Sequence, residues 1–299
     1  MRPVISLLFA VLIWATTFVV SEDALVTTSP AVLTILRFVL AAVTLVPLAL
    51  CLGSAMRTIV TRPIGMLLGL TGVATYYGLQ NLGLLYTTAG TAALLQAVLP
   101  IATALLAAVF LGERVTHRVV VGLALGTAGV ALVSFSAARL GVGALLIISG
   151  VLSYGVYTVA LRHYAQGATA GRDALAVAAV SSVWGVLFLA PWLAWEMLAG
   201  QARWPTATAT WWEVLYLGVV ASGLTLLLWS YGAARTAATV SGIFTAGIPA
   251  FGYAFAVLLG EPATWPRTLG GVMAVCGMVL AAWPSRADSG ARLAKCDRQ

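Results

Sequence analysis

The chain has 299 residues, of which 61% are apolar and 8% are charged, with a formal net charge of +7. Water-soluble domains carry about a quarter charged residues, so this composition excludes a protein whose whole surface faces water. The positive charge lies in short loops between apolar segments, where it sets membrane orientation, and we expect no nucleic acid partner.

Apolar runs of about 20 residues, the length that crosses a bilayer as a helix, recur along the chain. We identify ten, in chain order residues 3–21, 30–52, 63–84, 88–110, 116–136, 141–161, 173–195, 211–232, 237–259 and 265–283. The connections between them leave no room for a separate soluble domain. The sequence therefore predicts an all-α integral membrane protein with ten transmembrane helices.

The basic residues predict the orientation, because Lys and Arg concentrate in cytoplasmic loops. With the N-terminus in the cytoplasm, the cytoplasmic loops hold Arg2, Arg57, Arg62, Arg114, Arg118, Arg162, Arg172, Arg235, Arg286, Arg292, Lys295 and Arg298. The outward loops then hold Arg139, Arg203 and Arg267. We expect both termini to be cytoplasmic.

The two halves of the chain repeat each other. Leu-Gly-Glu occurs at 111–113 and again at 259–261, and Pro100 corresponds to Pro249. This predicts a five-helix repeat over residues 1–139, a second over 140–284, and a cytoplasmic tail over 285–299. Because five is odd, the two copies must be inverted, a construction typical of secondary transporters with a substrate site between the halves. The alternative is a duplicated structural scaffold.

A Trp-Ala pair at Trp14, an arginine at Arg37 in the second run, and Leu-Gly-Glu closing the fourth and ninth runs resemble the drug/metabolite transporter superfamily. More narrowly, the chain resembles the EamA-type exporters, which include bacterial amino acid exporters and an aromatic amino acid branch. The resemblance implies a bacterial inner membrane location. It also implies that runs 1, 3, 4, 6, 8 and 9 surround a central cavity.

Polar and aromatic side chains recur at equivalent depths in both halves, and lipid offers such groups no hydrogen-bond partner. Tyr76 and Gln80 share one helix face, and their counterparts are Thr225 and Trp229. The candidate substrate-binding residues are Trp14, Thr17, Arg37, Tyr76, Gln80, Gln96, Tyr154, Tyr157, Ser222, Thr225, Trp229, Ser241 and Thr245. The alternative for each is a side chain that joins helices by a hydrogen bond.

Among these candidates, Trp14 and Trp229 favour an aromatic or bulky apolar substrate, because their rings could stack on it. Plain core packing is the alternative. Arg37 is the one basic residue well inside a run, and it could bind a substrate carboxylate. We favour a structural role for it, bonded to backbone carbonyls or reaching outward.

Pro100 and Pro249 lie near the middle of their runs, where a proline removes a backbone hydrogen bond and kinks the helix. We interpret them as hinges for alternating access. Glu113 and Glu261 each precede the next run, and we interpret them as caps on the helix that follows.

We expect no Asp or Glu inside a span, which argues against a proton relay and against selection for cationic drugs. With Arg37 as the one available cation, phosphorylated substrates are disfavoured. His117 and His163 fall in loops, so an intramembrane enzyme is a remote alternative. The cysteines, Cys51, Cys276 and Cys296, form no metal or disulfide pattern, and no cofactor is expected.

We therefore predict a transporter, not an enzyme, that exports amino acids or related metabolites by alternating access. Aromatic or bulky neutral amino acids are the preferred cargo, transport is facilitative, and a monomer suffices. A proton-coupled exporter of organic cations is the alternative.

Overall fold

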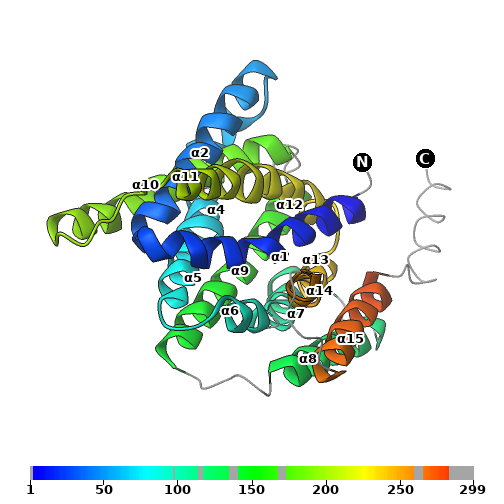
Figure 1. Ribbon diagram of the computed structural model, residues 1–299. Coiled ribbons are helices and arrows are strands. Elements are labelled where there is room, and N and C mark those ends of the chain that lie inside the picture. Colours follow the sequence, from blue (N-terminus) through cyan, green and yellow to red (C-terminus); the bar gives the residue numbers. More distant parts are fainter. Residues whose placement is uncertain are drawn as a thin grey trace.

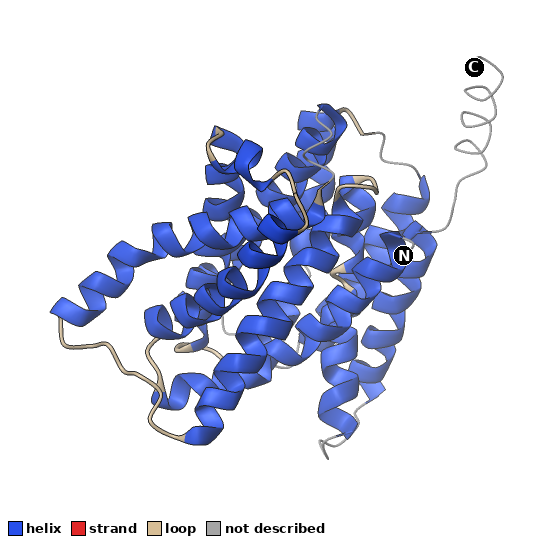
Figure 2. Ribbon diagram, turned by 90° about the horizontal axis from the view of Figure 1, so that it is seen from above, coloured by secondary structure: helices blue, strands red, loops and turns tan. Residues whose placement is uncertain are grey.

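The computed structural model describes residues 3–96, 98–113, 117–134, 141–167, 173–258 and 265–282. Over these residues every regular element is a helix and none is a strand (Figure 2). The predicted all-α class is therefore confirmed. The boundary at 139/140 and the predicted tail at 285–299 lie outside the described residues.

Every predicted apolar run falls on a helix or on consecutive helical segments. In chain order these are α1 (Pro3–Thr27), α2 (Pro30–Cys51), α3 (Met56–Val60), α4 (Pro63–Gly69), η1 (Leu70–Thr75), α5 (Tyr76–Leu84), α6 (Ala89–Leu95), α7 (Val98–Leu111), α8 (His117–Ser134), α9 (Val142–Gly167), α10 (Ala174–Leu198), α11 (Thr208–Leu215), η3 (Tyr216–Leu224), α12 (Thr225–Ala233), α13 (Ala238–Phe244), α14 (Gly247–Leu258) and α15 (Trp265–Ala282). The short helix α3 was not expected.

Five helical stretches are long and apolar enough to cross a bilayer: Pro3–Thr27, Pro30–Cys51, Val142–Gly167, Ala174–Leu198 and Thr208–Ala233. The fourth and ninth runs give shorter apolar helices, because each run is divided. The chain is thus an integral membrane protein by its helices, while the count of ten spans stays a prediction.

The expectation that no Asp or Glu lies inside a span is wrong. Helix α1 continues past residue 21 and contains Glu22 and Asp23, and α10 contains Glu196. Glu213 lies within the long stretch Thr208–Ala233 and already fell inside the run at 211–232. All four side chains belong to the outer turns of their helices, where a carboxylate can reach polar surroundings.

Glycines let neighbouring helices approach closely. A Cβ added at Gly69 would lie 2.9 Å from the backbone nitrogen of Gly185, and one at Gly277 would lie 2.9 Å from that of Gly126. These contacts join α4 to α10 and α15 to α8.

The helices form one bundle with a pair set at its edge. Helix α2 packs against α10, α1 against α12, and α5 against α9. Helices α8 and α15 lie side by side at the lower right of Figure 1. The main buried core is formed by the other helices, including α1, α2, α5, α9, α10 and α12.

Two irregularities occur at equivalent positions in the two halves. The π-helical segment η1 ends at Thr75, and η3 ends at Leu224, 149 residues later. Further on, α6 ends at Leu95 and α13 at Phe244, again 149 residues apart. π-helical turns are rare and concentrate at functional sites.

The interruptions of the fourth and ninth runs follow from their prolines. A proline cannot donate to the carbonyl four residues earlier. The Gln96 carbonyl therefore receives no hydrogen bond from Pro100, and the Thr245 carbonyl receives none from Pro249. Instead, Leu99 donates to the Gln96 oxygen at 2.9 Å and Ile248 to the Thr245 oxygen at 3.0 Å. Each run turns tightly at that point, and the role of the prolines as hinges stays a prediction.

The close approach of α4 and α10 can be tested with Gly69→Ala. The added methyl group meets backbone atoms of α10, and overpacking of this kind costs about 1–3 kcal/mol. We expect a lower thermal unfolding midpoint of the purified protein in detergent. Gly90→Ala is the matched control, because no atom outside its own helix lies within 4 Å of an added Cβ. Equal midpoints for the two variants would contradict this packing.

Candidate functional site

Five of the predicted residues form one cluster of aromatic rings at the centre of the bundle. The Trp14 ring of α1 lies 4.9 Å from the Trp229 ring of α12 and 5.6 Å from the Tyr154 ring of α9, measured between centroids. Tyr154 in turn lies 4.6 Å from Tyr76 of α5 and 5.0 Å from Tyr157. We call Trp14, Tyr76, Tyr154, Tyr157 and Trp229 the aromatic cluster.

The aromatic cluster is closed to solvent. Its most exposed member, Tyr76, has 5% of its surface accessible, and Trp229 and Tyr157 have none. Rings at these centroid distances touch one another, so no substrate-sized space separates them. The structure thus brings the predicted aromatic residues together as mutually packed rings. Substrate could enter only if they move apart.

Several polar atoms in and beside the aromatic cluster have no hydrogen-bond partner among the described residues. They are Trp14 Nε1, Trp229 Nε1, Tyr154 Oη, both amide atoms of Gln80, and Gln96 Nε2. The other amide atom of Gln96 accepts a hydrogen bond from Tyr76 Oη at 3.2 Å. Since buried polar groups are nearly always bonded, such a set needs an explanation, and a ligand that is absent supplies one.

Arg37 lies beside the aromatic cluster and is completely buried. Its Nε donates to Ser222 Oγ at 3.3 Å, and one terminal nitrogen donates to Ser21 Oγ at 3.2 Å. Its guanidinium carbon lies 4.8 Å from the centre of the Tyr77 ring, and the other terminal nitrogen has no partner among the described residues. These partners are hydroxyls and a ring, which differ from the backbone carbonyls that were expected.

Two site residues were missed from the sequence. Tyr77 joins Arg37 to the aromatic cluster, since its ring lies 4.7 Å from that of Tyr76. Ser230 shares a hydrogen bond of 3.1 Å with Tyr157 Oη. Both follow a predicted residue directly, and the helical-face argument placed them on another face. A regular α-helical wheel does not describe a span that contains a π-helical segment, which changes the register around it.

The remaining candidates are buried but have other partners. Four hydroxyls bond to carbonyls of their own helices, those of Thr17, Thr225, Ser241 and Thr245. Asn81, which follows Gln80, donates to Thr34 Oγ1 at 2.8 Å and so joins α5 to α2. The Thr17 hydroxyl bonds to the backbone carbonyl of Trp14, but none of the described hydrogen bonds of these four hydroxyls reaches a ring of the aromatic cluster.

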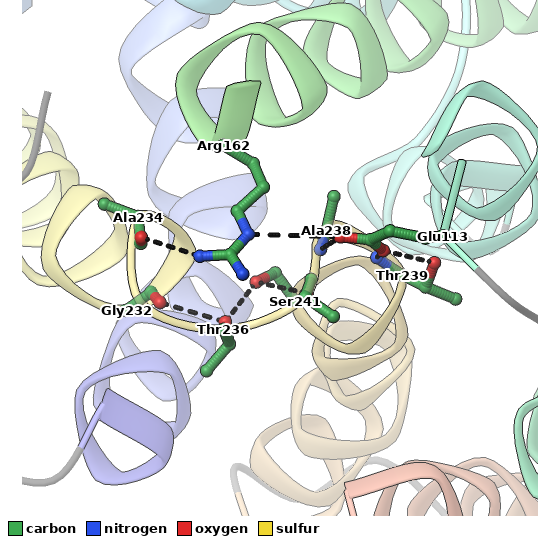
Figure 3. A network of polar contacts seen from close by, with 9 residues as sticks. Glu113, Arg162, Gly232, Ala234, Thr236, Ala238, Thr239 and Ser241 are labelled. Atoms are coloured by element: carbon green, nitrogen blue, oxygen red, sulfur yellow. Dashed lines mark hydrogen bonds and ion pairs between the residues drawn. The ribbon is translucent and has the colours of Figure 1, made fainter. Parts of the chain in front are cut away.

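At one end of the bundle, Glu113 connects the two halves (Figure 3). Its carboxylate accepts hydrogen bonds from the backbone nitrogens of Ala238 at 2.9 Å and Thr239 at 3.1 Å, at the start of α13. Arg162 of α9 lies 4.0 Å from the same carboxylate and donates to the Ala234 carbonyl at 3.0 Å. Its described hydrogen bonds therefore make Glu113 a cap on α13, in the second half of the chain, whereas the interpretation expected a cap on the helix that follows it. Glu261 lies outside the described residues.

A second carboxylate connects the halves at the opposite end. Glu196 of α10 is buried and accepts hydrogen bonds from Ser29 Oγ at 2.5 Å and from the backbone nitrogen of Ala31 at 3.1 Å, where α2 begins. Ser29 lies two residues beyond the C-terminal end of α1, whereas the N-terminal residues Pro3 and Leu7 of α1 pack near Gly232 of α12, six residues before α13 begins. Glu113 and Glu196 thus lie near opposite ends of α1.

In the part of the chain that the structure describes, no three His, Cys, Asp or Glu side chains gather as a metal site requires. The site is built from aromatic rings, amides, hydroxyls and one guanidinium. Such groups can bind and orient a small molecule without reacting with it.

The chain is similar to known proteins over most of its length. The sequence model of the EamA-like transporter family matches residues 1–135 and 141–283. A probable terminal-alkyne amino-acid exporter of Streptantibioticus cattleyicolor is 31% identical over 284 residues, which cover 93% of each chain. An uncharacterised transporter of Bacillus subtilis is 27% identical, over 79% of this chain and 73% of that protein.

A solved crystal structure superimposes with a TM-score of 0.75 over 94% of this chain and 97% of the other, at 21% identity, which shows a shared fold. These relatives are transporters and not enzymes. With both halves of the chain matched, the protein belongs to the EamA-like transporter family.

Proposed function

We propose that the protein exports amino acids, aromatic or bulky neutral ones by preference, across the inner membrane of a bacterium. The observation that carries this proposal is the buried aromatic cluster, in which Trp14 Nε1, Tyr154 Oη and Trp229 Nε1 lack partners among the described residues. The similarity to a probable terminal-alkyne amino-acid exporter supports an amino acid as the cargo. As a facilitator, the protein moves its substrate down a gradient, and a monomer suffices.

The proposed architecture has ten spans in two inverted halves, residues 1–139 and 140–284, with both termini in the cytoplasm. The matching positions of η1 and η3 support it, as do the matching interruptions before Pro100 and Pro249. Alternating access then consists of the halves rocking about these two interruptions around the aromatic cluster. Each interruption already has its hydrogen bonds rearranged, so bending there breaks few of them.

Arg37 supplies the site for the substrate carboxylate in this proposal. Its buried positive charge has no carboxylate within ion-pair distance among the described residues. A buried charge without a counter-charge is costly, and a bound carboxylate would offset that cost through a charge-assisted hydrogen bond to the unpartnered nitrogen.

The contacts of Glu113 close one end of the pathway. Its carboxylate fixes the start of α13 to the end of α7, and the polar network around it spans α9, α12 and α13 (Figure 3). Opening that end requires these hydrogen bonds to break, so Glu113 holds the resting state closed there.

A proton-coupled exporter of organic cations is the second candidate, favoured by one observation. Glu213 lies in the long apolar stretch Thr208–Ala233, and its Oε2 is buried without a partner among the described residues. A membrane carboxylate of this kind can carry a proton.

Counterflow in proteoliposomes tests the function. Vesicles that contain the purified protein are loaded with unlabelled tryptophan, phenylalanine, leucine, threonine, choline or a quaternary ammonium drug, and uptake of the matching label is followed with and without a proton gradient. We expect accumulation of aromatic amino acids without a gradient. Accumulation of organic cations alone, driven by protons, would replace this proposal with the second candidate.

Gln80→Leu separates substrate binding from helix joining. Neither amide atom of Gln80 has a partner among the described residues, so leucine loses no internal hydrogen bond and the unfolding midpoint should stay equal or rise. Transport at low substrate concentration should fall about tenfold, the effect of losing about 1.4 kcal/mol from a hydrogen bond to a charged group. A lower midpoint with unchanged transport would mean that Gln80 only joins helices.

Glu113→Ala should open the end that this residue closes. Loss of a helix cap costs about 1 kcal/mol, which raises the open population about fivefold. The measurement is the maleimide labelling rate of Ser241→Cys, a buried position behind the start of α13, in a chain whose three native cysteines are replaced.

Glu196→Ala is the matched control, because it removes a similar cap near the opposite end of α1. It should leave the labelling rate of Ser241→Cys unchanged. If both variants accelerate labelling equally, Glu113 is a general stabiliser and not a closure.

A further inference from the structure

Beyond the carboxylate, an amino acid carries a second charge, and no acidic group of the described residues lies where it could receive that charge. Six of the nine acidic residues fall in the described part of the chain. Glu113, Asp173 and Glu196 bind backbone nitrogens at helix starts. Glu22 is eight residues beyond Trp14 on α1, about 12 Å along the helix axis, and Asp23 is exposed.

Glu213 is also remote from the aromatic cluster. It lies on α11, and sixteen residues of continuous helix separate it from Trp229, which corresponds to about 24 Å along the axis. Within the described residues, then, no carboxylate contacts the rings. A positively charged amino group that enters the cluster meets ring faces, amide oxygens and hydroxyls.

Ring faces attract cations, because the π-electron cloud is negative above and below the ring plane. The protein already uses this interaction beside the cluster, where the Arg37 guanidinium lies over Tyr77. Tyr77 contacts Tyr76, and Tyr76 contacts Tyr154. Contacting rings thus connect the arginine to Trp14 and Trp229, whose planes are tilted by 48°. When the rings move apart, the two indoles can form two sides of a cage.

The unpartnered atoms match the two ends of a zwitterion. Gln80 Oε1 and Tyr154 Oη carry partial negative charge that can face an ammonium group with or without its N–H groups, and the free Arg37 nitrogen, Gln96 Nε2 and Gln80 Nε2 can donate to a carboxylate. Each of these side chains is at least nine-tenths buried. We propose that the aromatic cluster recognises the substrate's ammonium group by its ring faces, while Arg37 receives the carboxylate. The assignment of the substrate as an amino acid rests on the proposed function; the ring cage for a cation does not.

The test uses substrate analogues against the wild-type protein in proteoliposomes. Competition with labelled phenylalanine is measured for its N,N,N-trimethyl derivative and for 3-phenylpropionate, which lacks the amino group. Ring faces bind a trimethylammonium group as readily as a primary one, whereas a hydrogen-bonding or ion-pair site does not tolerate the methyl groups. We expect the trimethyl compound to compete within about threefold of phenylalanine, and the desamino compound to compete at least about tenfold more weakly.

Variants then test whether the preference for the ammonium compound depends on the aromatic cluster. Trp229→Leu should reduce the preference for the ammonium compound over the desamino compound about tenfold, and Trp229→Phe, which keeps a ring, should reduce it less. Trp192→Leu is the control, because Trp192 is half-buried against Gly78 and outside the cluster. The wild-type competition series decides the question even if Trp229→Leu does not fold.

Three results would overturn the inference: equal competition by 3-phenylpropionate, loss of competition on trimethylation, or an unchanged preference in a folded Trp229→Leu protein. Failure of the proposed function looks different. If no amino acid shows counterflow but choline raises the unfolding midpoint of the purified protein, the cage stands and the amino acid assignment falls. If neither amino acids nor choline bind, the cage is wrong as well.

Discussion

Hydrocarbon offers no hydrogen-bond partner, and the interior of this protein is arranged around that constraint. Every polar atom placed at membrane depth must find a partner inside the bundle or carry a free energy cost. The freed carbonyls of Gln96 and Thr245 are met by nitrogens three residues on. The hydroxyls of the spans mostly return to carbonyls of their own helices. Against this background of satisfied groups, the unpartnered atoms around Trp229, Tyr154 and Gln80 stand apart.

Those unpartnered atoms and the packed rings form one site, in which the unpartnered atoms lower the stability of the folded protein. The aromatic cluster gains stability from ring contacts and loses some through buried polar atoms without partners. Both terms change when substrate enters, because rings separate and polar atoms acquire partners. Exchange of one set of contacts for another lets a carrier bind without a large net gain, and weak net binding favours release on the other side.

The fold could be predicted from the composition and the internal repeat, because both patterns extend over many residues. Ten apolar runs predicted the helices to within a few residues at most ends, and the positions repeated at an interval of 149 residues predicted the two interrupted runs. The same reasoning assigned five aromatic residues from four separate helices to one candidate site, and their rings do contact one another: Trp14, Tyr76, Tyr154, Tyr157 and Trp229.

The predictions from sequence that were wrong concerned features that depend on local backbone geometry or on tertiary contacts. The π-helical segments η1 and η3 alter the helical register near Tyr77, and no pattern of apolar residues announces them. The partner of Glu113 is 125 residues away in the chain, so proximity in sequence pointed to the wrong helix. Glu22 and Asp23 of α1 and Glu196 of α10 were placed outside their spans because hydropathy fixes the middle of a span better than its ends. Glu213 already fell inside its predicted run.

The neighbouring indoles of Trp14 and Trp229 have an optical consequence. Two such chromophores at 4.9 Å with planes tilted by 48° form a chiral pair whose electronic transitions couple. Coupling falls steeply with separation, so the near-ultraviolet circular dichroism of the protein contains a signal specific to the closed rings. The molecule thus carries its own reporter of site opening, readable without labels or added cysteines.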